Sequence, residues 1–237
     1  MSEITSDDIM GFLVKVTEGL KPTTKKNKYS LLKNLFNFIK NTVDPDFHNP
    51  CNSAILTKTF RVGALPPWTI LEREAVDEFI FRTKNPRNRL MLELMARGGM
   101  RIGEVLRLKP QDVRDRKLNL SSPKSGRVAE VVFIPQKVAD RLREYISTAD
   151  IQDDNRIFPL GYTRAREIVR KAGNKIGLHV KPHDLRRHAA TYASRSGVPI
   201  EIVSKIILRH SNLSTTQRYL GKVSDTEAMY WIENIYR

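Results

Sequence analysis

The chain has 237 residues, of which 40% are hydrophobic, and 41 lysines and arginines against 26 acidic residues give it a net charge of +15. This length is enough for one large domain or two modest domains with a buried core. No apolar run approaches the roughly 18 residues that a membrane-spanning helix needs, and the acidic start MSEITSDD is unlike a secretory signal. The single cysteine, Cys51, excludes an internal disulfide and fits a reducing cytoplasm.

The positive charge is spread along the chain. Residues 1–67 carry 9 basic and 6 acidic side chains, and residues 68–237 carry 32 and 20, so the excess does not come from one basic tail. An excess of this size, with a pI of about 10.0, favours a polyanionic partner. Nucleic acid is preferred over an acidic membrane surface, because no basic amphipathic helix with exposed aromatic residues is found.

Two amphipathic helices are predicted near the N-terminus. Apolar residues recur with helical spacing from Ile9 to Val16, within a predicted helix over 7–19, and from Leu31 to Val43, within a predicted helix over 28–43. Lysines gather at the start of the second helix and in the turn before it. Three of them are candidate contacts to DNA phosphates, with a solvated helix face as the alternative: Lys25, Lys26 and Lys28.

Residues 44–67 are rich in Pro, Asn and Thr and lack helical periodicity, which predicts a linker with one possible further helix near 53–61. We therefore expect a small helical domain at 1–62, a linker at 63–67 and a second domain at 68–237.

The sequence of the second domain predicts a mainly α fold with a small antiparallel sheet. Thr69 and Glu72 have capping-box spacing at the start of a helix, and residues 88–97 are apolar on most sides, as in a central core helix ended by Gly98. The hairpin pattern follows, with strands at 117–121 and 128–134 joined by SPKSGR. Helical patterns return after residue 162.

Four short stretches carry candidate chemistry, and each alone has an ordinary structural interpretation. In 99–104, a glycine turn precedes Arg101 and Glu104, a pair that is common on protein surfaces. In 182–188, a proline at the first helical position would place His183 and Arg186 one turn apart on one side.

The third stretch follows an apolar helix pattern over 200–207 and runs from His210 to Tyr219, which alone would be a packing tyrosine. The fourth is Lys124 in the hairpin turn, which alone would be a surface lysine.

In this order and spacing, the four stretches resemble the tyrosine recombinases, the family of phage integrases and Xer-type site-specific recombinases. The resemblance covers about residues 68–225 and is most specific in HDLRRHAAT and LRHSNLSTTQRY. It implies a helical N-terminal domain that clamps DNA and a mixed α+β catalytic domain. Two positions depart from the common pattern, because Arg209 stands where many members have glycine and Arg187 where histidine is common; each would add a phosphate contact or alter packing.

The resemblance also implies a role for each candidate residue. Tyr219 would attack the scissile phosphate and form a 3′-phosphotyrosine, with Arg101 and Arg186 on the non-bridging oxygens. Lys124 would protonate the 5′-oxygen, His183 and His210 would assist by hydrogen bonding and proton transfer, and Glu104 would orient an arginine.

Charge stabilisation explains why such a site needs these residue types. A free phenol has a pKa of about 10 and is a poor nucleophile without a base or cations nearby. Two guanidinium forks suit the charge on the equatorial phosphate oxygens. A covalent ester keeps the bond energy, so religation needs no ATP; no metal or other cofactor is expected.

The expected function is DNA recombination or integration, as in the movement of a genetic element, by a cytoplasmic, DNA-associated enzyme. The expected partners are double-stranded DNA sites and three further copies of the chain, in a homotetramer that exchanges C-terminal tails. Two alternatives stay open: a catalytically silent DNA-binding protein of this fold, and a type IB topoisomerase-like enzyme.

Overall fold

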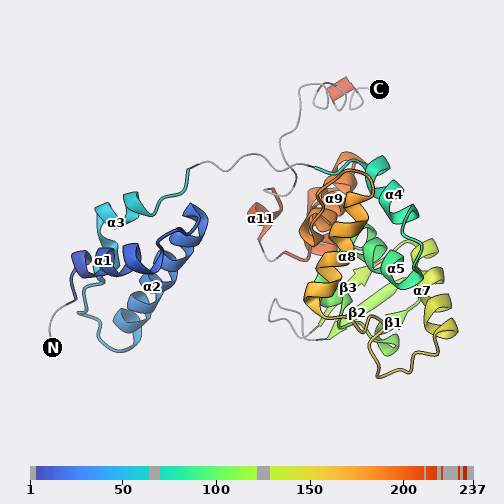
Figure 1. Cartoon of the computed structure of the whole chain (residues 1–237), viewed down its shortest axis with the longest axis horizontal. Helices are drawn as coiled ribbons and strands as arrows, with labels where there is room; N and C mark the ends of the chain where they lie inside the picture. The colour runs from blue at the N-terminus through green and yellow to red at the C-terminus, as the bar shows by residue number, and fades with distance from the viewer. Residues whose placement is uncertain are drawn as a thin grey trace. The chain divides into compact units, whose positions relative to one another are not determined.

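The computed structural model describes residues 4–63, 70–121, 129–210, 212–217, 220, 229 and 232–233. Over these residues the chain is mainly helical and contains one small antiparallel sheet. It divides into two compact units, residues 1–67 and 68–237, and each is described by itself (Figure 1). Across the described ranges, no helix has the length and apolarity needed to cross a bilayer.

The first unit contains helices α1 (Ser6–Val16), α2 (Pro22–Thr42) and α3 (Ala54–Thr59), with a short 3₁₀ helix at Pro50–Asn52. The start predicted for α2 was six residues too late, because Pro22 is compatible with the first helical position. The three candidate DNA-binding lysines therefore lie inside α2, with Lys26 and Lys28 exposed and Lys25 half-buried.

Cys51, Leu56 and Phe60 belong to the core of the first unit, so interpreting this stretch as linker was wrong. The Tyr29 hydroxyl donates to the Cys51 carbonyl at 2.9 Å, and the Tyr29 ring stacks on Phe60 with the centroids 5.3 Å apart. Cys51 and Leu56 are buried in the same cluster. Helix α3 confirms the short helix expected near 53–61. These contacts involve single side chains from short segments, which leave no periodic signal in the sequence.

The second unit combines helices with the sheet. Its helices are α4 (Arg73–Phe81), α5 (Pro86–Arg97), α6 (Ile102–Val105), α7 (Gln136–Thr148), α8 (Tyr162–Asn174), α9 (Pro182–Arg195), α10 (Ile200–Ile202) and α11 (Leu213–Gln217). A 3₁₀ helix spans Pro110–Asp112, and a π-helical turn, Val203–Ile207, continues α10. The strands are β1 (Val113–Arg114), β2 (Lys117–Ser121) and β3 (Ala129–Phe133), in the order β1-β2-β3.

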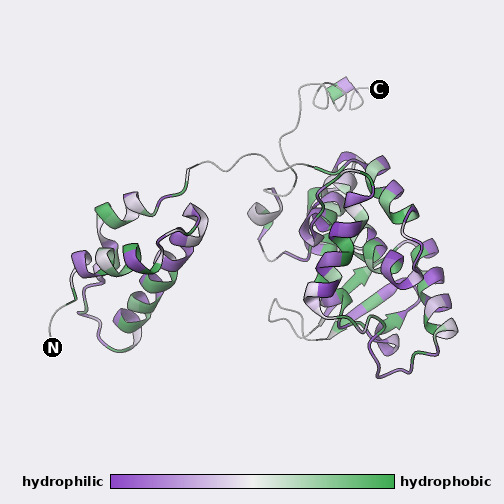
Figure 2. Ribbon diagram, viewed as in Figure 1, coloured by the Kyte–Doolittle hydropathy of each residue, from purple (hydrophilic) through white to green (hydrophobic). Residues whose placement is uncertain are grey.

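Helix α5 is the centre of the large core, as predicted. Every residue from Leu90 to Ala96 is buried, and α5 packs against α4, α7 and α9; Figure 2 shows apolar residues on α5 and on the strands. Helix α4 begins at Arg73 with Glu72 as its N-cap, so the predicted capping-box register was wrong. The Thr69 of that prediction lies outside the described residues.

The predicted hairpin is confirmed. Strands β2 and β3 pair antiparallel, with Lys117 opposite Phe133 and Ser121 opposite Ala129. The two-residue strand β1 and helix α7 were not predicted. The turn that contains Lys124 lies outside the described residues.

Candidate active site

The turn after α5 requires glycine at residue 99. Gly99 has φ +61°, and a Cβ atom there would lie 2.8 Å from the carbonyl oxygen of Ile207. A side chain at this position would therefore meet both backbone strain and a steric clash. The turn places Arg101 at the N-cap of α6.

Arg101 is held by a buried carboxylate. Its backbone N–H donates to Glu104 Oε2 at 2.8 Å, and its Nη1 donates to Oε1 at 2.6 Å. Glu104 is only 3% exposed, so this is not the surface pair that spacing alone suggested. Burial raises the pKa of Glu104, but Arg209 and the hydrogen bonds from Arg101 outweigh it and hold the pKa below its ordinary value. The carboxylate is therefore charged and fixes the Arg101 side chain.

Removing the Glu104 carboxylate should destabilise the protein strongly. Its Oε2 also accepts from Arg209 Nη2 at 2.6 Å, so Glu104→Ala leaves that buried guanidinium without one of its carboxylate partners. We expect a loss of about 3–5 kcal/mol in the free energy of unfolding, measured by urea denaturation. Asp140→Ala, which removes an exposed ion pair with Arg143, is the control and should cost less than about 1 kcal/mol. A similar cost for both variants would contradict the buried role of Glu104.

Helix α9 presents the second arginine. Pro182 is its first residue, which places His183 in the first turn and Arg186 one turn later, as predicted. Arg186 is 1% exposed, and its guanidinium donates to the carbonyls of Gly99 and Leu208. It thereby links the segment before Arg101 to the segment before His210.

His210 is oriented by a chain of hydroxyl groups. Thr216 Oγ1 donates to Ser204 Oγ at 2.8 Å, so it accepts from His210 Nδ1, which lies 2.9 Å away. The neutral imidazole therefore has its proton on Nδ1 and the acceptor lone pair on Nε2. Sequence reasoning missed Thr216 and Ser204, although Thr216 lies between the two motif positions His210 and Tyr219.

Replacing the Thr216 hydroxyl should slow any chemistry that uses His210. Thr216→Val keeps the branched shape but removes the acceptor that selects the tautomer. We expect the reaction rate to fall about 10- to 100-fold, by analogy with the partners that orient metal-ligating histidines. The exposed neighbour offers the control Thr215→Val, and equal rates for the two variants would contradict the role of Thr216.

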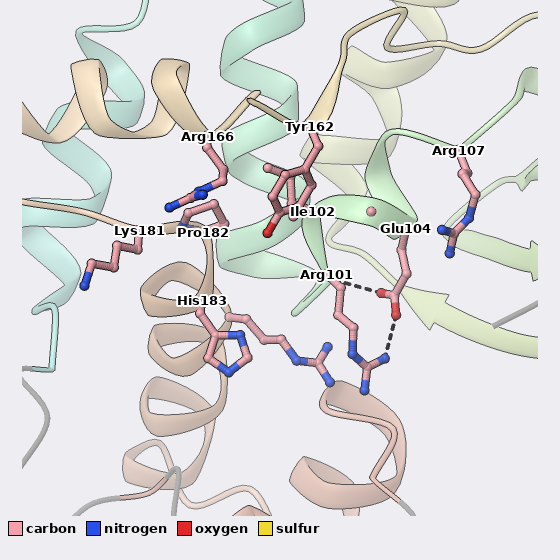
Figure 3. A pocket seen from close by; sticks show the side chains of 11 residues that line it. Arg101, Ile102, Glu104, Arg107, Tyr162, Arg166, Lys181, Pro182 and His183 are labelled. Carbon is pink, nitrogen blue, oxygen red and sulfur yellow. Dashed lines mark hydrogen bonds and ion pairs between the residues drawn. The ribbon is translucent and has the colours of Figure 1, made fainter. Parts of the chain in front are cut away.

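Arg101, His183 and Arg186 line one pocket of about 830 Å³ (Figure 3). The pocket also contains side chains that the motifs did not reveal: Arg107, Tyr162, Arg166 and Lys181. Tyr162 and Arg166 lie one turn apart on α8, with the guanidinium 5.9 Å from the ring centroid. Their helical spacing was the available signal, but no motif distinguished them from other basic surface residues. The lining is strongly basic, as a phosphate site requires.

Burial and this positive charge lower the pKa values of two histidines. Burial and then the charge of Arg186 lower the pKa of His183. Burial lowers the pKa of His210 to about 4, with further contributions from Arg186 and Arg101. Both histidines therefore lie close to the arginines and are neutral at pH 7.

These depressed pKa values give stability a pH dependence. Between the pKa of about 4 for folded His210 and the ordinary 6.5, the unfolded chain binds more protons. Stability should therefore fall as pH is lowered from 7 to 5, by about 1 kcal/mol for His210 after allowance for its partial exposure. His183 and His188, whose pKa values are also lowered, add to the fall. Urea denaturation at both pH values should show a smaller fall for His210→Gln; an equal fall would contradict the depressed pKa.

The structure does not test whether five of the predicted residues lie near this pocket. Lys124 and Tyr219 lie outside the described residues, and Lys25, Lys26 and Lys28 belong to the first unit.

The chain is similar to known proteins over most of its length. A model described as the phage integrase family matches residues 70–224. A tyrosine recombinase of Pseudothermotoga lettingae is 29% identical over 233 residues, which cover 94% of this chain and 79% of that protein. The tyrosine recombinase XerA of Thermococcus kodakarensis is 34% identical over 144 residues, which cover 56% of this chain and 50% of XerA.

A solved structure shares the fold. The Tn1549 transposon integrase, in complex with transposon right end DNA, superposes with a TM-score of 0.75 at 17% identity, covering 100% of this chain and 87% of that one.

Proposed function

Because the chain belongs to the phage integrase family and is a tyrosine-type site-specific DNA recombinase, we propose that it cuts and rejoins DNA through a 3′-phosphotyrosine on Tyr219. The observation that supports this most directly is the convergence of Arg101, His183 and Arg186 on one basic pocket. Residues from two segments that are distant in sequence, Arg101 before α6 and the His183–Arg186 pair on α9, thus line a single basic pocket.

The proposed reaction is a transesterification. The Tyr219 oxygen attacks phosphorus as its proton passes to a neutral histidine, His183 or His210. The bond to the 5′-oxygen breaks, and Lys124 gives that oxygen a proton. Arg101 and Arg186 stabilise the charge on the non-bridging oxygens. A 5′-hydroxyl from another strand reverses these steps, so the reaction consumes no ATP. The proposed steps also use no metal ion.

The proposed partners are double-stranded DNA sites. We assign phosphate contacts in the first unit to Lys25, Lys26 and Lys28, and we propose that four copies act together on two duplexes by exchanging C-terminal tails. The Tn1549 integrase was solved with DNA, which supports a DNA partner here. Such a protein would be found with the DNA of the cell.

Covalent trapping tests the proposal. The protein is mixed, in EDTA, with labelled nicked duplexes of random sequence, because a nick lets the short cut fragment diffuse away. An SDS-resistant band should form, and mass spectrometry of its digest should find a nucleotide on the peptide that contains Tyr219. Tight binding without adduct on recovered high-affinity sites would instead favour a silent DNA-binding protein. Relaxation of supercoiled plasmid without a preferred site would favour a topoisomerase-like enzyme.

A further inference from the structure

Arg209 has a backbone conformation that favours glycine. Its φ is +49°, in the left-handed region, which has an energetic cost for a residue with a Cβ. Glycine, the residue that the family resemblance led us to expect, would avoid this cost. Contacts made by the arginine side chain offset it.

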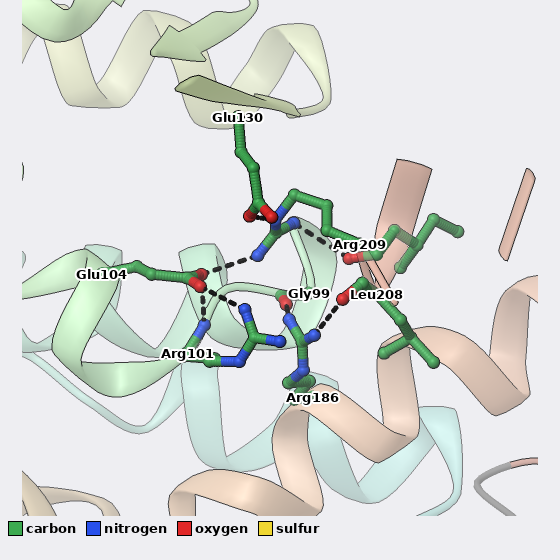
Figure 4. A network of polar contacts seen from close by, with 8 residues as sticks. Gly99, Arg101, Glu104, Glu130, Arg186, Leu208 and Arg209 are labelled. Carbon is green, nitrogen blue, oxygen red and sulfur yellow. Dashed lines mark hydrogen bonds and ion pairs between the residues drawn. The ribbon is translucent and has the colours of Figure 1, made fainter. Parts of the chain in front are cut away.

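The guanidinium of Arg209 is buried and directed at protein acceptors. Nη1 donates to the Ile207 carbonyl at 2.9 Å and Nη2 to Glu104 Oε2 at 2.6 Å, while Nε lies at an ion-pair distance of 3.2 Å from Glu130 Oε2 (Figure 4). The Nε contact has ion-pair distance but not hydrogen-bond geometry. Arg209 is 3% exposed and is not among the residues that line the pocket. The added arginine therefore does not contact phosphate.

One carboxylate connects Arg209 to a pocket arginine. Glu104 Oε1 accepts from Arg101 Nη1, while Oε2 accepts from the Arg101 backbone and from Arg209 Nη2. Both oxygens are thus occupied, and the rotamer of Glu104 is fixed from two sides. The direction of the Arg101 guanidinium therefore depends on the presence of Arg209.

The second carboxylate connects Arg209 to the sheet. Glu130 is buried on β3, the strand that follows the hairpin turn, and β3 packs against the π-helical turn that precedes Arg209. The residue next to Arg209 is His210. One guanidinium thus joins α6, β3 and the segment that leads into His210.

We propose that Arg209 is a positioning residue for strand cleavage, which aligns Arg101 through Glu104 and attaches the His210 segment to β3 through Glu130. This proposal rests on the proposed function, and it assigns Arg209 no contact with DNA. It also explains why a buried arginine at a strained position faces the buried carboxylate of Glu130.

Three variants separate positioning from stability. Arg209→Gly relieves the backbone strain but removes the guanidinium. Arg209→Gly with Glu130→Gln also removes the carboxylate left without that partner, which should restore much of the thermal stability. Arg209→Lys keeps the charge without the fork geometry and should rescue cleavage only in part.

The first measurement is the adduct rate on nicked DNA, together with the salt dependence of binding. Arg209→Gly should cleave about 10- to 100-fold more slowly, as expected for a displaced catalytic group, and the double variant should stay slow. The slope of log affinity against log salt should not change, because no phosphate contact is lost. A parental rate in the double variant would reduce Arg209 to a structural role, and a slope reduced by about 1 would make it a phosphate contact.

The second measurement does not depend on activity. Among the residues that the structure describes, the charged groups around Glu104 are Arg101, Arg107, Asp112, Arg186, Arg209 and, across Arg209, Glu130. In protein labelled with ¹³C at glutamate carboxyls, and assigned with Glu104→Gln, Glu104 should titrate at higher pH in Arg209→Gly than in the parent. An unchanged titration would overturn the proposal. If the parent forms no adduct, the proposed recombinase function fails, and this titration still decides whether Arg209 controls Glu104.

Discussion

Tyr219→Phe should abolish the SDS-resistant DNA adduct while leaving DNA binding intact. The variant lacks a single oxygen, which in the proposed reaction is the atom that bonds to phosphorus. We expect a loss of at least about 10⁴-fold in adduct formation, the range observed when a covalent enzyme loses its nucleophile. Single-turnover trapping on nicked duplexes, with binding measured in parallel, gives both quantities.

Tyr162 supplies a matched control. It lines the pocket beside the arginines, and the residue is 56% exposed, so it is also accessible to DNA. Tyr162→Phe should form the adduct at a rate close to that of the parent. If the adduct persisted in Tyr219→Phe and disappeared in Tyr162→Phe, the proposed nucleophile would be wrong although the covalent mechanism would survive.

Arg186→Lys should slow cleavage by about 10²–10³-fold, the usual cost of one lost transition-state donor. The guanidinium of Arg186 spans two carbonyls, those of Gly99 and Leu208, and also lines the pocket. An ammonium group is a point charge that cannot reproduce this fork. The measurement is the single-turnover rate, with the melting temperature recorded to separate chemistry from unfolding.

The control for this variant is Arg170→Lys, at an exposed position of α8. It should change neither the rate nor the melting temperature. A loss below tenfold in folded Arg186→Lys would show that charge alone suffices and that the fork geometry is unimportant.

Much of the second unit could be predicted from local patterns. The apolar run around Leu92 predicted the central helix, the turn residues SPKSGR between two strand segments predicted the hairpin, and Pro182 located the start of α9. These features are determined by residues close together in the sequence, so local sequence patterns can predict them. The motif spacing likewise identified His183 and Arg186, because helical geometry determines which residues share a face.

The features that escaped prediction depend on contacts between distant segments. Glu104 and Arg101 form a common surface pair by spacing, and only burial with Arg209 makes the pair structural. Within the apolar helix pattern predicted over 200–207, Val203 is buried but Ile206 is 37% exposed, because the wider π-helical turn changes the direction in which its side chains face. A prediction from periodicity assumes a regular α-helix and therefore cannot identify such a turn.

The carbonyl bonds of Arg186 also determine when the pocket can exist during synthesis. They join positions 87 and 22 residues away, Gly99 and Leu208. A nascent chain that has emerged only as far as α9 contains Arg101 and both ends of α6, but the Leu208 carbonyl that completes the clamp has not yet emerged. Assembly of the pocket is therefore delayed until nearly the whole chain is available, and a product that ends before Leu208 would lack the second of the two carbonyls that hold Arg186.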